Sequence, residues 1–409
     1  MSIMATNLQK EFSIANVEAL FKTDFKEYYE ETFNQSTPFW SQVTKTNDFH
    51  GKRLEFPVPI GYQSGIGSGS LPEHNNAPYG DVIISSKKMY ALSRVDRESI
   101  MASMTDEGAF VRAISECISK TVEADVWNHS RAAFGNSDGS LGTIATSGVT
   151  DNGGGNYSIV ISTATWKESN WEENQLVNVS TGTELFSITT VTPSTRTIII
   201  QRQAGGIQVP AQAEVVYMQG SKDNDIKGLK GVLDATTGSQ YGVTVSRRWK
   251  AYNDLLSYGA GVTPELMNKV VLGVEKQCGK SINHIVTSYV QYEKILNQLE
   301  DKKRYQMTSI KPKGMEGGIS FEGVQFMSSK GPVPIFPDKH CDDDRMYFLN
   351  MDYIKYFRRP KSGWVKEDIA GNNGYLRVVG EDQLEARHAT YGELFIAPPF
   401  HGVVSGLTT

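Results

Sequence analysis

The stretch MASMTDEGAFVRAISECISKTVEADVWNHSRAAFG, residues 101–135, decides how the rest of this chain is arranged. Thr105 is a suitable N-cap, acidic residues follow it in the first turn, and Gly135 ends the pattern. Apolar side chains recur between these limits with the spacing of one helix face, at Phe110, Val111, Ile114, Cys117, Ile118, Val122 and Val126. We therefore expect an amphipathic helix from Thr105 to Phe134, about 44 Å long, which is enough to span a domain.

The overall composition is that of an ordinary globular protein. Its 409 residues are 39% hydrophobic, and 41 basic against 46 acidic side chains leave a formal net charge of −5, which is no general reason to expect nucleic-acid binding. No apolar run approaches the roughly 20 residues that cross a bilayer, and the polar start lacks the apolar core of a signal peptide. The 3 cysteines, Cys117, Cys278 and Cys341, indicate neither a disulfide framework nor a zinc site. We expect a protein of the cytosol without membrane contact.

The residues before the helix have the pattern of an arm followed by a long hairpin. Residues 1 to 51 mix short amphipathic pieces with polar linkers and show no core of their own. From Arg53 to Ile60 apolar residues alternate with polar ones and two prolines, which predicts an edge or ribbon strand. Glycine-rich loop chemistry follows at 62–81, and a second strand is expected from Val82 to Leu92. Because an isolated hairpin is marginal in water, we expect this one to rest on another subunit.

The residues after the helix divide into two parts. Residues 136 to 220 are rich in Gly, Ser, Thr and Asn with short strand-like runs, which predicts an inserted all-β module. From Val262 onward helix and strand patterns alternate, beginning with a helix capped by Thr263 and ended by Gly279. A last strand is expected from Leu384 to Ile396, completing a mixed sheet. The fold class predicted is α+β with a β-rich insertion.

Three short motifs mimic functional sites without their required spacing. Gly279 to Ser281 resembles the end of a phosphate-binding loop, but the preceding glycine is misplaced and the segment follows a helix. Asp223 to Asp234 mimics a calcium loop with wrong residues at two ligand positions, so a turn before a strand is expected. His340 to Asp344 collects ligand-type residues, which we interpret as a solvated acidic turn. No nucleophile and histidine form a recognisable pair, so we predict no enzyme, no cofactor and no metal site.

The order of these parts resembles the major capsid protein of tailed bacteriophages with the HK97-type fold. The closing run GEDQLEARHATYGELFIAPPFHG, Gly380 to Gly402, is similar to the terminal P-domain strand of that family. The resemblance implies the following division: an N-terminal arm at 1–51, an E-loop at 52–92, a P-domain at 93–135, 221–261 and 350–409 with the long helix as its spine, an inserted β-rich module at 136–220, and an A-domain at 262–349.

The resemblance also implies a function. The chain would be a structural subunit that forms hexamers and pentamers of an icosahedral shell around double-stranded DNA, in the virion, after assembly in the host cytoplasm. Scaffolding and portal proteins would be partners, with a decoration protein as a further candidate. Some members cross-link an E-loop lysine, but Gly61 to Ser86 contains none, so we expect no covalent cross-link. Since only about fifty residues precede the E-loop, we expect a separate scaffolding protein instead of a fused scaffolding segment.

Inter-subunit contacts are expected on the E-loop and on two charged A-domain loops, at Arg53, Glu55, Tyr62, Leu71, Glu73, Lys302, Lys303, Arg304, Asp342, Asp343 and Asp344. A closed ring requires a contact between unlike patches, so we hypothesise that the basic loop of one subunit meets the acidic loop of the next. The alternative is two independent solvated loops, because exposed ion pairs contribute only about 0 to 1 kcal/mol each.

Two other functions remain open from the sequence. One is the shell protein of an encapsulin-like compartment, which packages enzymes instead of a genome. The other is a β-rich carbohydrate-binding or hydrolytic protein, with residues 136 to 220 as its binding module.

Overall fold

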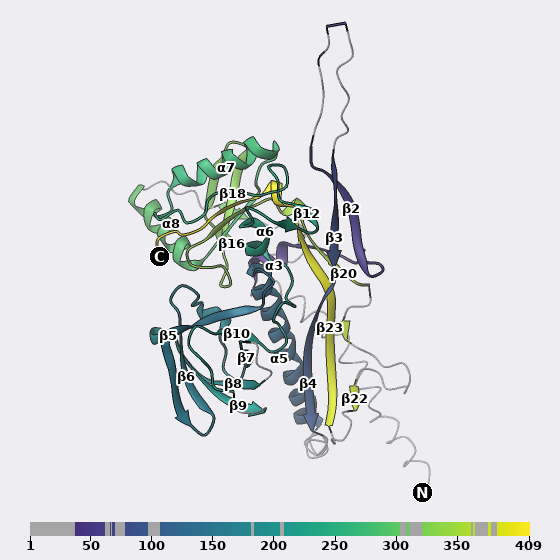
Figure 1. The fold of residues 1–409 in the computed structure, drawn as a ribbon, viewed down its shortest axis with the longest axis vertical. Helices are drawn as coiled ribbons and strands as arrows, with labels where there is room; N and C mark the ends of the chain where they lie inside the picture. Colours follow the sequence, from purple (N-terminus) through teal and green to yellow (C-terminus); the bar gives the residue numbers. More distant parts are fainter. Residues whose placement is uncertain are drawn as a thin grey trace.

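The computed structural model describes residues 37–61, 66, 68–69, 78–96, 107–180, 184–204, 208–302, 308–310, 321–360, 363–364, 375–377 and 383–409. Within these ranges, four parts can be distinguished: a long helix on a long sheet, a closed barrel, a compact sheet with two helices, and a projecting hairpin (Figure 1). The first three parts each have their own hydrophobic cluster. In that same portion of the chain, no helix is long and apolar enough to cross a membrane.

The long helix is α5, Glu107–Phe134, and it confirms the helix expected from the sequence. Its described apolar positions are buried, with Val122 at 2% exposure and Val126 at 1%. The expected cap Thr105 and the side chains of residues 107–119 lie outside the described part. Lys120 pairs with Glu123 across one turn at 2.9 Å. From Lys120 onward, the helix therefore buries its apolar positions as its periodicity required.

The long sheet is organised around one strand. This is β23, Gln383–Ile396, which pairs antiparallel with β4 over ten residue pairs and then with β20 toward its own end. Figure 1 shows β4 and β23 running side by side along α5. The other strands are β4 (Lys87–Asp96), β20 (Ile354–Arg358), β1 (Thr44–Thr46), β21 (Gly363–Trp364) and β22 (Tyr375–Arg377).

The hairpin consists of β2, Arg53–Pro59, and β3, Tyr79–Ser85, paired from Arg53↔Ser85 to Pro59↔Tyr79. The sequence predicted one second strand from Val82 to Leu92, and this was wrong in one respect. The strand changes partner at Ser86, and its continuation β4 leaves β2 to join β23. The hairpin is thus a direct extension of the long sheet.

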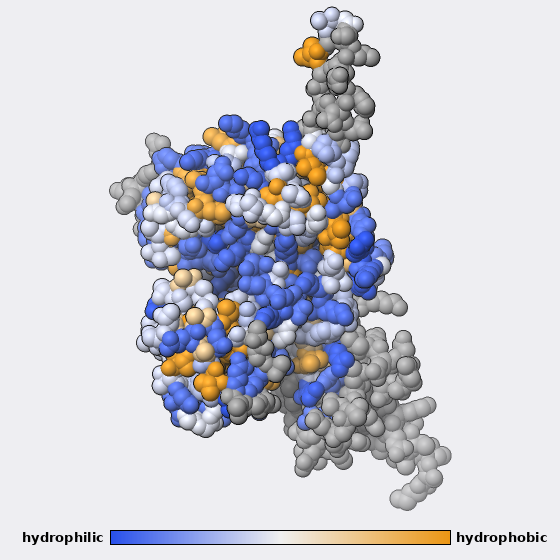
Figure 2. Space-filling view, in the orientation of Figure 1, coloured by the Kyte–Doolittle hydropathy of each residue, from blue (hydrophilic) through white to orange (hydrophobic). Residues whose placement is uncertain are grey.

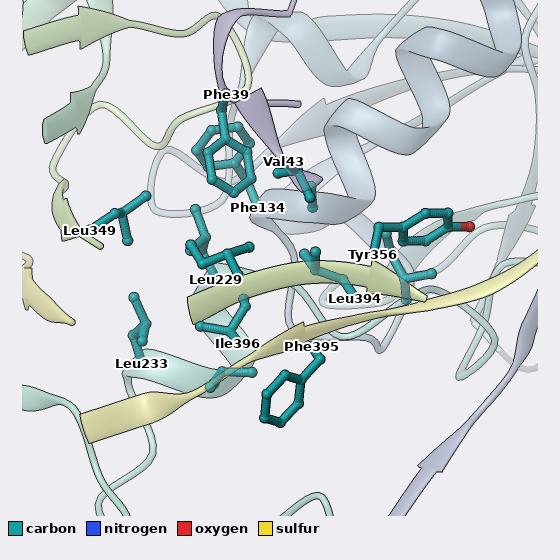
Figure 3. Packing of buried hydrophobic residues seen from close by; sticks show 14 of the residues in the cluster. Phe39, Val43, Phe134, Leu229, Leu233, Leu349, Tyr356, Leu394, Phe395 and Ile396 are labelled. Carbon is teal, nitrogen blue, oxygen red and sulfur yellow. The ribbon is translucent and has the colours of Figure 1, made fainter. Parts of the chain in front are cut away.

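The described end of the expected arm is not an arm but part of the core. Helix α3, Pro38–Gln42, inserts two aromatic side chains that are almost fully buried, Phe39 and Trp40. Phe39 packs on Phe134 at the end of α5, with ring centroids 5.3 Å apart. Trp40 lies edge-on to Tyr356 of β20 at 5.0 Å. Figure 3 shows this cluster closing around Leu394 and Ile396 of β23.

The expected all-β insertion is a closed six-stranded barrel in the order β10-β5-β6-β9-β8-β7. Its interior is filled by side chains with no exposed surface, among them Ile159, Phe186, Ile188 and Ile198. The strands are β5 (Ser140–Gly153), β6 (Asn156–Ile161), β7 (Leu176–Val179), β8 (Leu185–Thr192), β9 (Thr197–Ala204) and β10 (Val215–Met218), with short 3-10 turns η1 (Glu168–Asn170) and η2 (Pro193–Thr195). Closure leaves no open sheet edge in the barrel.

The compact sheet is mixed and has the order β13-β24-β19-β14-β18-β17. Two of its strands, β13 (Tyr252–Leu255) and β24 (Gly402–Val404), come from segments that the sequence assigned to the P-domain, and β23 belongs to the other sheet. The remaining strands are β14 (His284–Thr287), β17 (Gln325–Ser328), β18 (Gly331–Pro337) and β19 (Met346–Leu349). The chain therefore passes between the two sheets more often than the sequence pattern indicated.

Two helices accompany this sheet. Helix α7, Pro264–Cys278, begins as expected: the Thr263 side chain accepts a hydrogen bond from Leu266 N, and Gly279 ends the helix in a left-handed conformation. Gly279 is thus a helix cap and not part of a phosphate cradle. Helix α8, Tyr289–Lys302, follows β14. The remaining described elements are β11 (Ser239–Gln240), β12 (Val243–Thr244), β15 (Thr308–Ile310), β16 (Phe321–Gly323), η3 (Met351–Tyr353) and η4 (Pro398–Phe400).

The turn expected before a strand at Asp223 to Asp234 leads instead into a short helix, α6, Leu229–Leu233. Its N-cap Gly228 lies against the last turn of α5, where an added Cβ would stand 2.5 Å from the carbonyl oxygen of Ala133. No side chain fits at that distance. The glycine of the calcium-like pattern, Gly228, therefore allows α6 to approach the end of α5 closely.

Substituting Gly228→Ala is expected to lower the free energy of unfolding by about 1 to 3 kcal/mol, because the methyl group must push α6 away from α5. Urea denaturation followed by circular dichroism measures the change. Gly261→Ala is the matched control, since its nearest neighbour would be Thr408 Oγ1 at an ordinary 3.6 Å. Equal stability of the two variants would contradict the argument.

Candidate assembly surfaces

The base of the hairpin is anchored in its own chain. Phe56 of β2 meets Phe395 of β23 edge-on at 5.2 Å, and Val82 and Ile84 of β3 are fully buried. Ile83 N donates to the carbonyl of Tyr241 at 2.8 Å. The sequence predicted a hairpin that rests on another subunit, but its base packs on its own chain. Contact with another subunit remains a prediction for the far end, where Ile66 is fully exposed.

The predicted contact residues of the hairpin fall into two groups. Arg53 and Glu55 alternate with half-buried positions on β2, so both point to the outer face, and they form an ion pair with each other. Their side chains are 57% and 44% exposed. Tyr62, Leu71 and Glu73 lie outside the described residues. An inter-subunit role for all five stays a prediction.

The acidic loop contains a side chain that is engaged within the chain. Asp342 accepts from Lys167 Nζ at 3.0 Å and from Lys230 Nζ at 3.2 Å, and Arg345 Nε lies 3.3 Å away. Burial alone would raise the pKa of Asp342, but these three cations outweigh it and hold the pKa well below its usual range. Asp342 is therefore the centre of an ion-pair network within the chain. We call Asp342 with Lys167, Lys230 and Arg345 the Asp342 junction.

This junction joins three parts of the fold. Lys167 comes from the barrel, Lys230 from α6 and Arg345 from the residue before β19. Arg345 Nη1 also donates to both carboxylate oxygens of Asp234, at 2.8 and 2.7 Å. Lys167 further donates to the carbonyl of His340. The barrel is thus coupled to its surroundings by a charged network.

The other residues of the two charged loops are placed differently. Asp343 is exposed, and Asp344 is partly exposed while its Oδ2 accepts from Gly406 N at 3.1 Å. Lys302 is the last residue of α8, and Lys303 and Arg304 lie outside the described residues. The basic-against-acidic hypothesis stays a prediction, with Asp342 removed from the acids that a neighbour could meet.

The interpretation of His340 to Asp344 as a solvated turn was wrong for its first residues. His340 is fully buried beside Trp127, with ring centroids 5.9 Å apart, and Cys341 is 2% exposed. Burial, with Lys167 nearby, lowers the pKa of His340 well below its usual value. Asp338 accepts from His340 N and from Phe39 N, which fixes the turn to α3. Among the described residues, no group of three or more His, Cys, Asp or Glu could hold a metal ion.

A second buried charge cluster fastens α5 to β23. Asp125 on the helix lies 3.4 Å from His129 Nδ1 and 3.2 Å from His388 Nδ1 on the strand. Although burial opposes it, the two histidines hold the pKa of Asp125 well below its usual range. Although burial also disfavours the imidazolium, Asp125 raises the pKa of His129. The cluster ties the helix to the strand at one register.

A third buried acid, Glu393, lies further along β23. Its Oε1 accepts from Lys227 N at 2.7 Å and from Leu394 N at 3.2 Å. Burial raises its pKa to about 7, even though these donors and nearby lysines act in the opposite direction. The pKa of Glu385, on the same strand, is shifted in the opposite direction. Burial raises this pKa, but Arg387 and Arg94 lower it by more.

Sequence reasoning missed all of these clusters. Lys167 and Asp342 are 175 residues apart, and Asp125 and His388 are separated by most of the chain. A single charged residue within a polar run carries no sign of burial. The alternation of β23 is the only signal that could have placed His388 on its inner face.

The comparisons with known proteins bear on this fold. No protein-family model and no curated protein sequence matches the chain. A capsid chain of cyanophage A-1(L) is similar in structure with a TM-score of 0.54 at 12% identity, over 91% of this chain and 93% of that one. The chain has an HK97-like capsid fold.

Two further likenesses have lower scores. The encapsulin of a complex from Synechococcus elongatus has a TM-score of 0.46 at 7% identity, over 91% of this chain and 89% of that one. A capsid chain of a GTA particle has 0.42 at 7%, over 90% and 88%.

Substituting Lys167→Met is expected to reduce the free energy of unfolding by about 1.5 to 3 kcal/mol, because Asp342 loses one of its charged hydrogen-bond donors. Since the pKa of Asp342 is lowered by folding, its stabilising contribution is present above the usual carboxyl range and is lost as the pH falls. The difference from the wild type should therefore shrink in acid. Urea denaturation at several pH values measures it. Lys269→Met, on the exposed face of α7, is the control, and an equal effect in both variants would contradict the role of the junction.

Substituting Glu393→Gln is expected to stabilise the protein at pH 8 by up to about 3 kcal/mol. The folded state holds the Glu393 proton to about pH 7, whereas the unfolded chain releases it near 4.5, so the wild type loses stability as the pH rises between these values. The two proteins should be equally stable at pH 4. Glu385→Gln is the control with the opposite sign and should destabilise at pH 8. A wild-type stability that is flat from pH 4.5 to 7 would contradict the assignment.

Proposed function

We propose that this chain is the major capsid protein of a tailed bacteriophage. It would be the structural subunit that forms hexamers and pentamers of an icosahedral shell around double-stranded DNA, located in the virion and assembled in the host cytoplasm. The likeness to the cyanophage A-1(L) capsid chain over 91% of this chain supports the proposal. The role would be association and not catalysis.

The observation that carries the proposal is the hairpin. Its base is held by Phe395 and Tyr241, while Ile66, beyond the last paired residues Pro59 and Tyr79, is fully exposed. A large apolar side chain held away from the body gains stability only if it meets another surface. A second copy of the chain supplies that surface in a shell.

The buried charges support a structural role as well. Asp338, Asp342 and Glu393 each accept hydrogen bonds from a different part of the same chain, and Asp125 lies 3.2 Å from His388 Nδ1. Each group therefore joins elements of the subunit. Such cross-links suit a subunit that must keep its shape while it bears contacts on several sides.

Further partners belong to the proposal. Scaffolding and portal proteins, and a decoration protein as a further candidate, would meet the assembled shell. The DNA would be enclosed without sequence-specific binding, since the net charge of −5 provides no general attraction to phosphates.

An encapsulin-like compartment is the second candidate, because the fold by itself suits either cargo. The nucleic-acid content of purified particles separates the two. A carbohydrate-binding or hydrolytic function of the barrel is less well supported. Ile159, Ile188, Ile198 and Ile200 fill its interior, which leaves no central cavity for a ligand.

The purified protein is expected to form closed shells visible by negative-stain electron microscopy. Replacing residues 61–77 by Asn-Gly should leave a folded subunit that does not assemble, because the two-residue turn then joins Ile60 to Pro78, whose backbones already pair, and keeps the anchored base. Ile66→Asp should weaken assembly in the same direction, with Ser68→Asp as the matched control. Normal shells from the shortened chain would contradict the role of the hairpin, and a wild type without shells would contradict the proposed function.

A further inference from the structure

A groove separates the barrel from the compact sheet. Its volume is about 570 Å³. One wall consists of the barrel residues Lys167, Glu168, Ser169, Trp171, Glu172, Glu173, Val191 and Pro193, and the other of Tyr289, Val290, Lys339, Cys341 and Asp343. Figure 2 shows the left contour of the molecule indented between these two parts. The Lys167–Asp342 ion pair joins the two walls, so the groove has a fixed width.

The groove combines an apolar lining with an exposed aromatic. Trp171 stacks on Trp166 with ring centroids 6.2 Å apart, and Val191 and Pro193 continue the apolar wall. Tyr289, at the start of α8, is 59% exposed on the other side. Exposed tyrosines beside apolar surface are typical of protein interfaces.

The rim of the groove is acidic. Glu168, Glu172 and Glu173 are exposed and have no ion-pair partner among the described residues, and Asp343 is exposed opposite them. Lys167 is committed to Asp342 and the His340 carbonyl. Among the lining residues, Lys339 is the one cation left to oppose four carboxylates.

The opposite flank of the subunit is basic. In Figure 1, β12 and β20 lie on the side of the hairpin, across the molecule from β5, β6 and α8. The segments next to β12 and β20 contain the acidic residues Asp48, Asp81 and Asp352 but more cations, all exposed or partly exposed: Lys45, Arg247, Arg248, Lys355, Arg358 and Arg359.

One basic turn on this flank is rigid. Ser246 and Trp249 form an isolated bridge, and the Trp249 side chain is 3% exposed and donates from Nε1 to the carbonyl of Gln240 at 3.2 Å. This anchor presents Arg247 and Arg248 to the outside. A held turn loses little conformational freedom on binding.

We infer that the acidic groove of one subunit receives the basic turn Ser246–Trp249 of the next copy in the ring. The inference rests on the proposed function, since it requires a ring of copies. A closed ring needs a head-to-tail contact between two unlike patches, and the groove and the turn are unlike in charge and lie on opposite flanks. Complementary charge then sets register and excludes wrong pairings.

The test is a charge exchange in the full-length protein. Glu172→Lys with Glu173→Lys should reduce the yield of shells by about tenfold or more, and so should Arg247→Glu with Arg248→Glu. The four substitutions together should restore most of the wild-type yield. Lys269→Glu, an exposed charge change on α7, which does not line the groove, is the control and should assemble normally. Circular dichroism and urea denaturation check that each variant is folded, and the neutral pair Glu172→Gln with Glu173→Gln should give an intermediate yield.

The outcomes distinguish the proposed capsid function from the contact between the groove and the basic turn. A wild type that forms no shells would remove the proposed function itself. Shells from the wild type and equally from both charge-reversed pairs would overturn the groove contact alone. Impairment of both pairs without rescue in the combination would overturn the pairing as well, because each patch would then act through some other partner.

Discussion

The antiparallel ladder between β4 and β23 is the constraint on which the rest of the structure depends. Its ten residue pairs, from Gln383↔Asp96 to Gly392↔Lys87, hold together segments from opposite ends of the chain. One face of the ladder receives α5, and the Asp125–His129–His388 cluster sets the register between helix and strand. Because a shift of one residue would turn every inner side chain outward, the buried histidine fixes the alignment of the whole long sheet.

Buried charge is used throughout the subunit to join parts that the chain order separates. Asp342 connects the barrel, α6 and the compact sheet, and Asp338 connects α3 to the same turn. A carboxylate in such a place is strongly destabilising if one partner is lost, whereas an apolar contact tolerates small shifts. These junctions therefore favour one relative placement of the parts, which suits a subunit that presents its hairpin on one flank and its groove on the other.

The hairpin has a base that is packed into the core and an apolar residue beyond it that is exposed. Its base shares the core of the long sheet through Phe56 and Phe395, so its direction is set by the subunit. Beyond Pro59 and Tyr79 the described Ile66 has no cover from its own chain. The hairpin thus has a base fixed by its own chain and an apolar side chain exposed beyond it.

The sequence by itself determined the elements whose signal is periodic: α5 from its three-and-four spacing, α7 from Thr263 and Gly279, the strands of the hairpin and β23 from alternation. It also determined that residues 136–220 are β-rich and that the order of parts resembles a capsid fold. Only the tertiary structure decided that β4 leaves the hairpin for β23, that Phe39 and Trp40 are core, and that Asp342 is an internal junction. The reason is physical: periodicity is local and survives in the sequence, whereas strand partners and buried ion pairs depend on which distant segments share a low-dielectric space.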